Sequence, residues 1–66
     1  MRVVINGEEQ IVQDGISVAD LVVALGLNRR RIAVELNQQI VAREAYEQRQ
    51  LAADDALEIV TFVGGG

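Results

Sequence analysis

Few residues of this chain could carry out covalent or acid–base chemistry. The sequence contains no Cys, no His and no Lys, so it lacks a thiol nucleophile, an imidazole base and a side-chain amine. Thiolate and imidazole metal ligands are excluded for the same reason. Paired carboxylates remain at Glu8–Glu9 and Asp54–Asp55, but adjacent acids in polar turns are typical of solvated surface. We therefore expect neither a self-sufficient enzyme nor a bound cofactor or metal ion.

The remaining group with useful chemistry is the carboxylate of Gly66, which follows Gly64 and Gly65. Three residues without side chains can enter a narrow channel, and when fully extended they reach about 10 Å. A carboxylate is a poor electrophile, so it must gain a leaving group such as AMP before a nucleophile can attack it. Because the glycines do not form a GxxxxGK[ST] phosphate-binding loop, a partner would have to bind the ATP. The alternative is a frayed tail without a function.

The elements that would position this tail can be predicted from local patterns. A helix over 18–25 is indicated by apolar residues at i, i+3, i+4 and i+7, with Ser17 as N-cap and Gly26 as C-terminal cap. The polar segment 43–50 is expected to be a helical turn or a loop. Short β-branched runs between turn residues indicate five strands, at 1–5, 8–13, 32–37, 39–41 and 57–63.

The predicted order β-β-α-β-β-β places the chain in the α+β class. With 66 residues there is room for one domain, which we assign to residues 1–63, followed by a flexible C-terminal glycine tail at 64–66. A mixed sheet with one main helix across one face is the arrangement of the ubiquitin-like β-grasp fold. In that fold the first and last strands form a parallel central pair, which fixes where the tail emerges.

The last predicted strand places two apolar side chains next to the tail. Its residues alternate between the two faces of the sheet, so Leu57 and Ile59 would face the helix while Val60 and Phe62 face outward. Two apolar neighbours beside the tail predict a docking patch for a partner protein. The alternative is that Phe62 folds over the sheet edge.

Charge and hydropathy narrow the class of partner. The net charge of −4 argues against nucleic acid, whose binding rests on cationic contacts to phosphates. The basic run Arg29–Arg31 is expected to be a solvated loop after the helix, where cations suit the helix dipole. No apolar run approaches the roughly 20 residues that span a bilayer, and no signal peptide is recognisable. We expect a cytoplasmic protein that is monomeric when free.

One longer pattern resembles a known family, the ThiS sulfur carriers of thiamin biosynthesis. The matching positions run from Val34-Glu35-Leu36-Asn37 through Ile40-Val41, Arg43-Glu44, Tyr46, Leu51, Asp55 and Leu57–Val60 to Phe62-Val63-Gly64-Gly65-Gly66. The first strand, the Asn6-Gly7 turn and the helix fit as well. Ala42 stands where many members have Pro, and Asp54-Asp55-Ala56 replaces a common Gly-Asp turn, so local turn geometry differs there.

The resemblance implies a mechanism in which Gly66 carries sulfur. An E1-like adenylyltransferase would activate the Gly66 carboxylate with Mg-ATP, a sulfur donor would convert it to a thiocarboxylate, and thiazole synthase would take the sulfur. Gly64 and Gly65 would then supply clearance, while Val60 and Phe62 would dock on the partners. Because the chain has no Lys or Cys, its side chains offer no strong nucleophile to the activated Gly66. We interpret this as a limit on self-acylation that leaves the N-terminal amine as the only amine.

Three alternatives stay open at this point. The chain could carry sulfur in another pathway, such as molybdopterin synthesis. It could be a ubiquitin-like modifier whose tail is joined to lysines of target proteins. It could also be a β-grasp module that only binds, with an inert tail.

Overall fold

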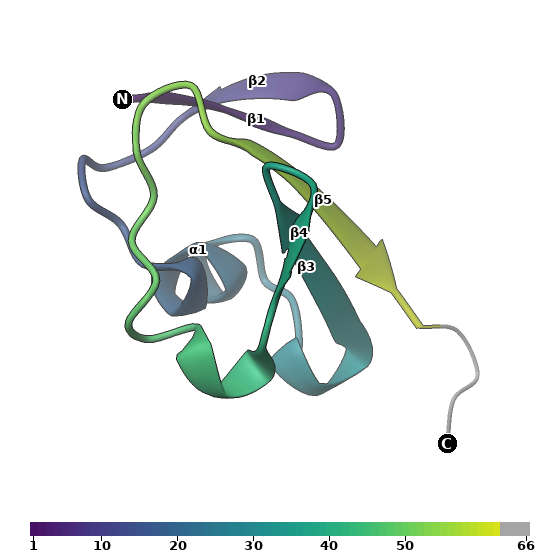
Figure 1. Ribbon diagram of the computed structural model, residues 1–66. Coiled ribbons are helices and arrows are strands. Elements are labelled where there is room, and N and C mark those ends of the chain that lie inside the picture. Colours follow the sequence, from purple (N-terminus) through teal and green to yellow (C-terminus); the bar gives the residue numbers. More distant parts are fainter. Residues whose placement is uncertain (63–66) are drawn as a thin grey trace.

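The fold is a five-stranded mixed sheet with one helix packed against one of its faces (Figure 1). The structure is a computed structural model and describes residues 1–62. The strands lie in the order β2-β1-β5-β3-β4, and β1 is parallel to β5 as predicted. The bounds are β1 (Arg2–Ile5), β2 (Glu8–Ile11), α1 (Val18–Ala24), β3 (Ile32–Leu36), β4 (Gln39–Val41) and β5 (Ala56–Thr61). Two 3-10 turns complete the list, η1 (Arg29–Arg31) and η2 (Arg43–Ala45).

The helix α1 begins and ends where its capping residues predict. The Ser17 hydroxyl oxygen accepts a hydrogen bond from the Asp20 backbone N–H at 3.0 Å. At the other end Gly26 has a φ of 72°, and its N–H donates to the Val23 carbonyl while the next N–H, of Leu27, donates to Val22. This pair of bonds satisfies the last carbonyls of the helix and turns the chain towards η1.

The core lies between α1 and the sheet, and most of it follows from strand alternation. The predicted inward residues of the last strand, Leu57 and Ile59, are buried. The segment 43–50 contributes more than a polar turn, because Tyr46 is only 1% exposed and completes the core below the helix. The other core residues are Val3, Ile5, Val18, Leu21, Val22, Ile32, Val34, Leu36, Val41 and Leu51.

Two asparagines join the hairpin turns to the central strand β5. Asn6 has a φ of 50° in the turn between β1 and β2; its side chain accepts from the Ile59 N–H at 2.7 Å and donates to the Ile59 carbonyl at 3.2 Å. Asn37 has a φ of 51° in the turn between β3 and β4, and its side chain accepts from the Ala56 N–H at 3.0 Å and donates to Asp55. The backbone N–H of each asparagine also donates to β5, to the Leu57 carbonyl from Asn6 and to the Ala56 carbonyl from Asn37, so each side chain extends the ladder by further bonds.

Predicted and observed boundaries agree within two residues where both are described. The strand predicted at 8–13 ends at Ile11, although the Val12 N–H still donates to the Met1 carbonyl. The strand predicted at 57–63 begins one residue earlier, at Ala56. Residues 63–66 lie outside the described part, so the predicted tail at 64–66 stays a prediction. Among residues 1–62, no helix is long and apolar enough to cross a membrane.

Replacing Asn6 tests the link between the first hairpin and β5. Asn6→Ala removes the two partly buried hydrogen bonds to Ile59. It also places an alanine at a positive φ, which is strained because alanine has a Cβ and no polar side chain to bond its own backbone. The free energy of unfolding should therefore fall by about 2–3 kcal/mol. Asn6→Gly tolerates the same φ and should lose only about 1–2 kcal/mol. Urea unfolding followed by circular dichroism measures both changes. Wild-type stability in both variants would contradict the link.

Candidate functional site

The central strand β5 leads directly to the predicted reactive tail. Thr61 is in register with Ile32 of β3, and the Phe62 N–H donates to the Arg31 carbonyl at 2.7 Å. Strand pairing therefore continues up to the last described residue. Gly64, Gly65 and Gly66 lie outside the described residues, so their roles remain predictions. What the structure defines is the root of the tail, which lies where β5 ends beside the start of β3 (Figure 1).

Val60 and Phe62 face away from the helix, as their alternation predicts. Val60 is 55% exposed and Phe62 is 48% exposed, whereas Ile59, which lies opposite Val34 of β3, is buried. The alternative that Phe62 folds over a sheet edge stays open, because the pairing of β5 with β1 ends at Leu57 and, among the described strands, only β3 lies beside β5 near Phe62. The role of these two side chains in partner binding stays a prediction.

The apolar surface around them is wider than the sequence suggested. Val60 lies directly opposite Ala33 on β3, and on the next strand Ile40 is 75% exposed. We call Ala33, Ile40, Val60 and Phe62 the outer sheet patch. Ile40 was missed because β4 is only three residues long, which is too short for its alternation to stand out; the buried neighbour Val41 was the available signal.

The basic run next to this patch is only partly solvated. The Arg29 guanidinium pairs with the Glu47 carboxylate, donates to the Arg43 carbonyl at 2.7 Å and lies 5.0 Å from the Tyr46 ring centroid. The hydrogen bond from Arg29 lowers the pKa of the Glu47 carboxyl and raises the pKa of the guanidinium. The Arg29 side chain is still 36% exposed, so the run lies at the surface as expected, and Arg29 in addition joins η1 to η2. Its neighbour Arg31 is exposed at the tail root.

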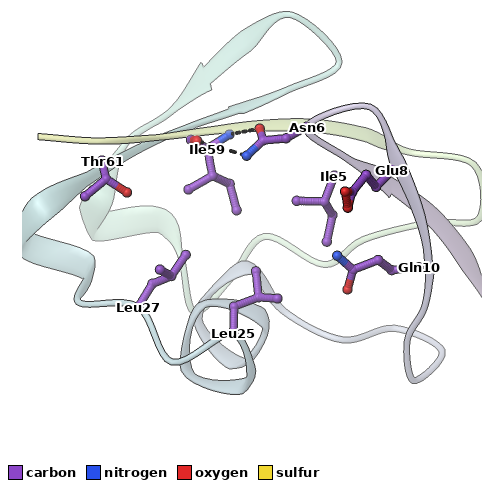
Figure 2. A pocket seen from close by; sticks show the side chains of 8 residues that line it. All are labelled: Ile5, Asn6, Glu8, Gln10, Leu25, Leu27, Ile59 and Thr61. Atoms are coloured by element: carbon purple, nitrogen blue, oxygen red, sulfur yellow. Dashed lines mark hydrogen bonds between the residues drawn. The ribbon is translucent and has the colours of Figure 1, made fainter.

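One hollow among residues 1–62 lies beside the first hairpin and has no reactive side-chain pair on its rim. It lies between the end of α1 and the first hairpin, has a volume of about 340 Å³, and is open to solvent (Figure 2). Apolar side chains of Ile5, Leu25 and Ile59 face it, and the Asn6 amide on its rim is already bonded to Ile59. No group of three or more metal-ligating side chains occurs within the described residues.

The amine of Met1 is held far from the tail root. It donates to the Val12 carbonyl at 2.6 Å and pairs with the Asp14 carboxylate at 3.0 Å. Because β1 and β5 run parallel, with Val4 in register with Ala56, the start of β1 and the end of β5 lie at opposite ends of the sheet (Figure 1). This amine is therefore bonded and remote from Phe62.

Comparison with known proteins places the chain in a family. Residues 2–66 match the sequence model of the ThiS family. The chain is 44% identical over all of its 66 residues to a thiazole synthase of Paramagnetospirillum magneticum, and it spans only 20% of that protein's length. It is 38% identical over 50 residues to the sulfur carrier protein ThiS of Bacillus subtilis, covering 76% of each chain.

A solved structure agrees with these sequence matches. The crystal structure of the thiamine biosynthesis protein ThiS from Geobacter metallireducens superposes with a TM-score of 0.86 at 32% identity, covering 100% of both chains. The match confirms the predicted ubiquitin-like β-grasp fold. The chain therefore belongs to the ThiS family, whose members among these relatives include a sulfur carrier and a thiamine biosynthesis protein.

Proposed function

We propose that this chain is a sulfur-carrying cosubstrate, not an enzyme, in the formation of the thiazole ring of thiamin. The observation that carries the proposal is its similarity to the Bacillus subtilis sulfur carrier over three quarters of both chains. The fold supports the proposal because its central strand leads towards Gly64, Gly65 and Gly66. Sulfur would be carried as a thiocarboxylate at Gly66.

The chemistry at Gly66 requires two activation steps. A carboxylate oxygen attacks the α-phosphorus of Mg-ATP and releases pyrophosphate, which gives an acyl-adenylate. Sulfur at the oxidation level of sulfide then attacks the acyl carbon, the bond to AMP breaks, and AMP leaves, which gives the thiocarboxylate. Because the sequence has no phosphate-binding loop of its own, an E1-like adenylyltransferase supplies the nucleotide site. Gly64 and Gly65 give the tail clearance to enter that site.

The partner that receives the sulfur is a thiazole synthase. Two thiazole synthases, from Paramagnetospirillum magneticum and Magnetococcus marinus, contain a segment similar to the whole of this chain, at 44% and 36% identity. This segment is 20% of each protein's length. A carrier-like segment inside a thiazole synthase supports a direct contact between the two. Val60 and Phe62 dock on these partners beside the tail.

The activated tail meets few nucleophiles of its own chain. The sequence has no Lys or Cys, and the Met1 amine is bonded to Val12 and Asp14 at the far end of the sheet. An amine held in these two contacts at the far end of the sheet is not placed to attack a group beside Phe62. We infer that this arrangement keeps the acyl-adenylate available for sulfur.

Deleting Gly66 tests the carrier function. Incubation with the cognate adenylyltransferase, Mg-ATP and a sulfur source should raise the mass of the wild-type chain by the difference between sulfur and oxygen. The variant should show no such change, and cells that carry it should require added thiamin. Intact mass spectrometry also establishes whether Gly66 is the terminal residue of the purified protein.

Three outcomes would contradict this function. Thiamin-independent growth of the deletion strain would exclude the role in thiamin synthesis. Conjugates with other proteins, and no gain of sulfur, would favour a ubiquitin-like modifier. Sulfur loading combined with a defect in molybdopterin only would favour the other carrier pathway.

Serine substitutions test the docking role of the outer sheet patch. Val60→Ser and Phe62→Ser should each raise the adenylyltransferase concentration needed for half-maximal loading by about tenfold or more, because apolar anchors at an interface commonly contribute 1–3 kcal/mol. Val23→Ser is the matched control, since Val23 is 75% exposed on the helix side. Equal effects of Val60→Ser and Val23→Ser would contradict the docking role.

A lysine placed at the tail root tests the limit on self-acylation. Arg31→Lys keeps the charge and puts an amine beside Phe62, so activation should yield a cyclised carrier that is lighter by one water. Arg49→Lys is the control, because Arg49 lies beside the start of α1, where its backbone carbonyl accepts a hydrogen bond from the Val18 N–H. Intact mass after incubation with adenylyltransferase and Mg-ATP measures the product. Identical product profiles in the two variants would contradict the inference.

A further inference from the structure

The outer face of β3 and β5 carries side chains of different chemistry in successive rows. In the first row Glu58 lies directly opposite Glu35, and Glu35 lies opposite Ile40 of β4, so this row is apolar at its β4 end. In the second row Val60 lies opposite Ala33. In the third row the backbone N–H of Phe62 donates a hydrogen bond to the Arg31 carbonyl. Rows two residues apart are separated by about 6.6 Å, so the carboxylates and the arginine bracket an apolar centre over about 13 Å.

The Glu35–Glu58 pair works against the stability of the sheet. Like charges directly opposite each other on neighbouring strands repel, and these two lie on the central strands β3 and β5. Among residues 1–62, neither carboxylate forms an ion pair or accepts a side-chain hydrogen bond. A cation from outside the domain would remove this repulsion.

The opposite end of the patch has the opposite charge. Four arginines and two glutamates lie within residues 29–31 and 43–47, which gives these two stretches a formal charge of +2; they are Arg29, Arg30, Arg31, Arg43, Glu44 and Glu47. The remaining two arginines and eight acids give the rest of the chain a charge of −6, which sums to the net −4. Glu47 is already neutralised by Arg29. The exposed Arg31 forms no ion pair with any described residue.

We propose that these rows make the outer sheet patch an oriented docking surface for a protein with the reverse charge order. This partner surface has a carboxylate near the mouth of its tail channel, an apolar centre, and a basic side chain about 13 Å further on. The carboxylate meets Arg31, the centre meets Val60 and Phe62, and the basic side chain lies between Glu35 and Glu58. The inference rests on the proposed function and deepens it, because the charge order fixes which way the carrier faces.

An apolar patch alone does not determine in which orientation the carrier binds its partner, because apolar contacts are not directional. Turning the carrier by half a turn in the plane of the sheet would place Arg31 on the partner's basic side chain and Glu58 on its carboxylate. Like-charge contacts at an interface suppress such wrong poses more than complementary pairs add affinity. When the carrier binds in the favoured orientation, the end of β5 therefore points towards the partner's tail channel.

A second copy of the chain is the competing occupant. A two-fold arrangement would also bring Arg31 of one copy near Glu58 of the other. We favour a different protein because a two-fold pair would cover both tail roots, whereas the proposed carrier must present its tail to two enzymes. Sedimentation of the free chain separates the two cases, and a stable dimer that loses its stability in Arg31→Glu would overturn the proposal.

Charge reversals at the two ends supply the main test. Arg31→Glu should weaken binding to the unloaded adenylyltransferase by about tenfold at low salt, and the loss should shrink as salt screens the contact. Arg49→Glu is the matched control, because Arg49 is exposed, unpaired among the described residues and outside the patch. It should bind like the wild type.

Glu58→Arg gives a result that a purely structural role cannot produce. The new cation faces Glu35, so the thermal midpoint should rise, while binding to the adenylyltransferase should fall by about tenfold. Unchanged binding in Glu58→Arg, or equal binding by Arg31→Glu and Arg49→Glu, would overturn the proposal. A failure of the carrier function is distinguishable, because the wild type would then gain no sulfur whereas binding is measured without sulfur or ATP.

Discussion

The strand β5 is hydrogen-bonded to a neighbouring strand on each side, and the rest of the fold is arranged around it. Its backbone pairs with β1 in parallel and with β3 in antiparallel register. Where these ladders stop, Asn6 and Asn37 extend them by further bonds from their side-chain amides. Each asparagine also adopts the positive φ of its hairpin turn. One residue type thereby closes a hairpin and fastens the central strand, so the tail root has a fixed position relative to the outer sheet patch.

Much of this could be predicted from short-range patterns. Ser17 and Gly26 define the helix because capping depends on neighbours within a few residues. The alternation in β5 gives the outward direction of Val60 and Phe62 because each side chain follows from strand geometry alone. Such features depend on contacts close in sequence, and the sequence contains them in full.

Contacts between residues far apart in the sequence could not be predicted from such local patterns. Asn6 lies 53 residues from Ile59, and a hairpin turn explains an asparagine without any distant partner. Tyr46 is buried because η2 folds below the helix, and the polar composition of 43–50 hides this. Arg29 is indistinguishable in sequence from its two basic neighbours, although it alone contacts Glu47 and Tyr46 among the described residues. In each case the missing information is which elements meet, and the sequence pattern does not contain it.

The hydrogen bonds that hold β5 between its neighbours have a mechanical consequence. Under the proposed function, a partner that holds the outer sheet and draws the tail into a channel would apply its force along β5. The hydrogen bonds of the antiparallel ladder to β3 lie perpendicular to the strand, and those of the parallel ladder to β1 are slanted across it, so this force would load both sets together as shear instead of opening them one by one. The domain would therefore stay folded while its tail is pulled, because the hydrogen bonds of β5 would resist the force together and not break one after another.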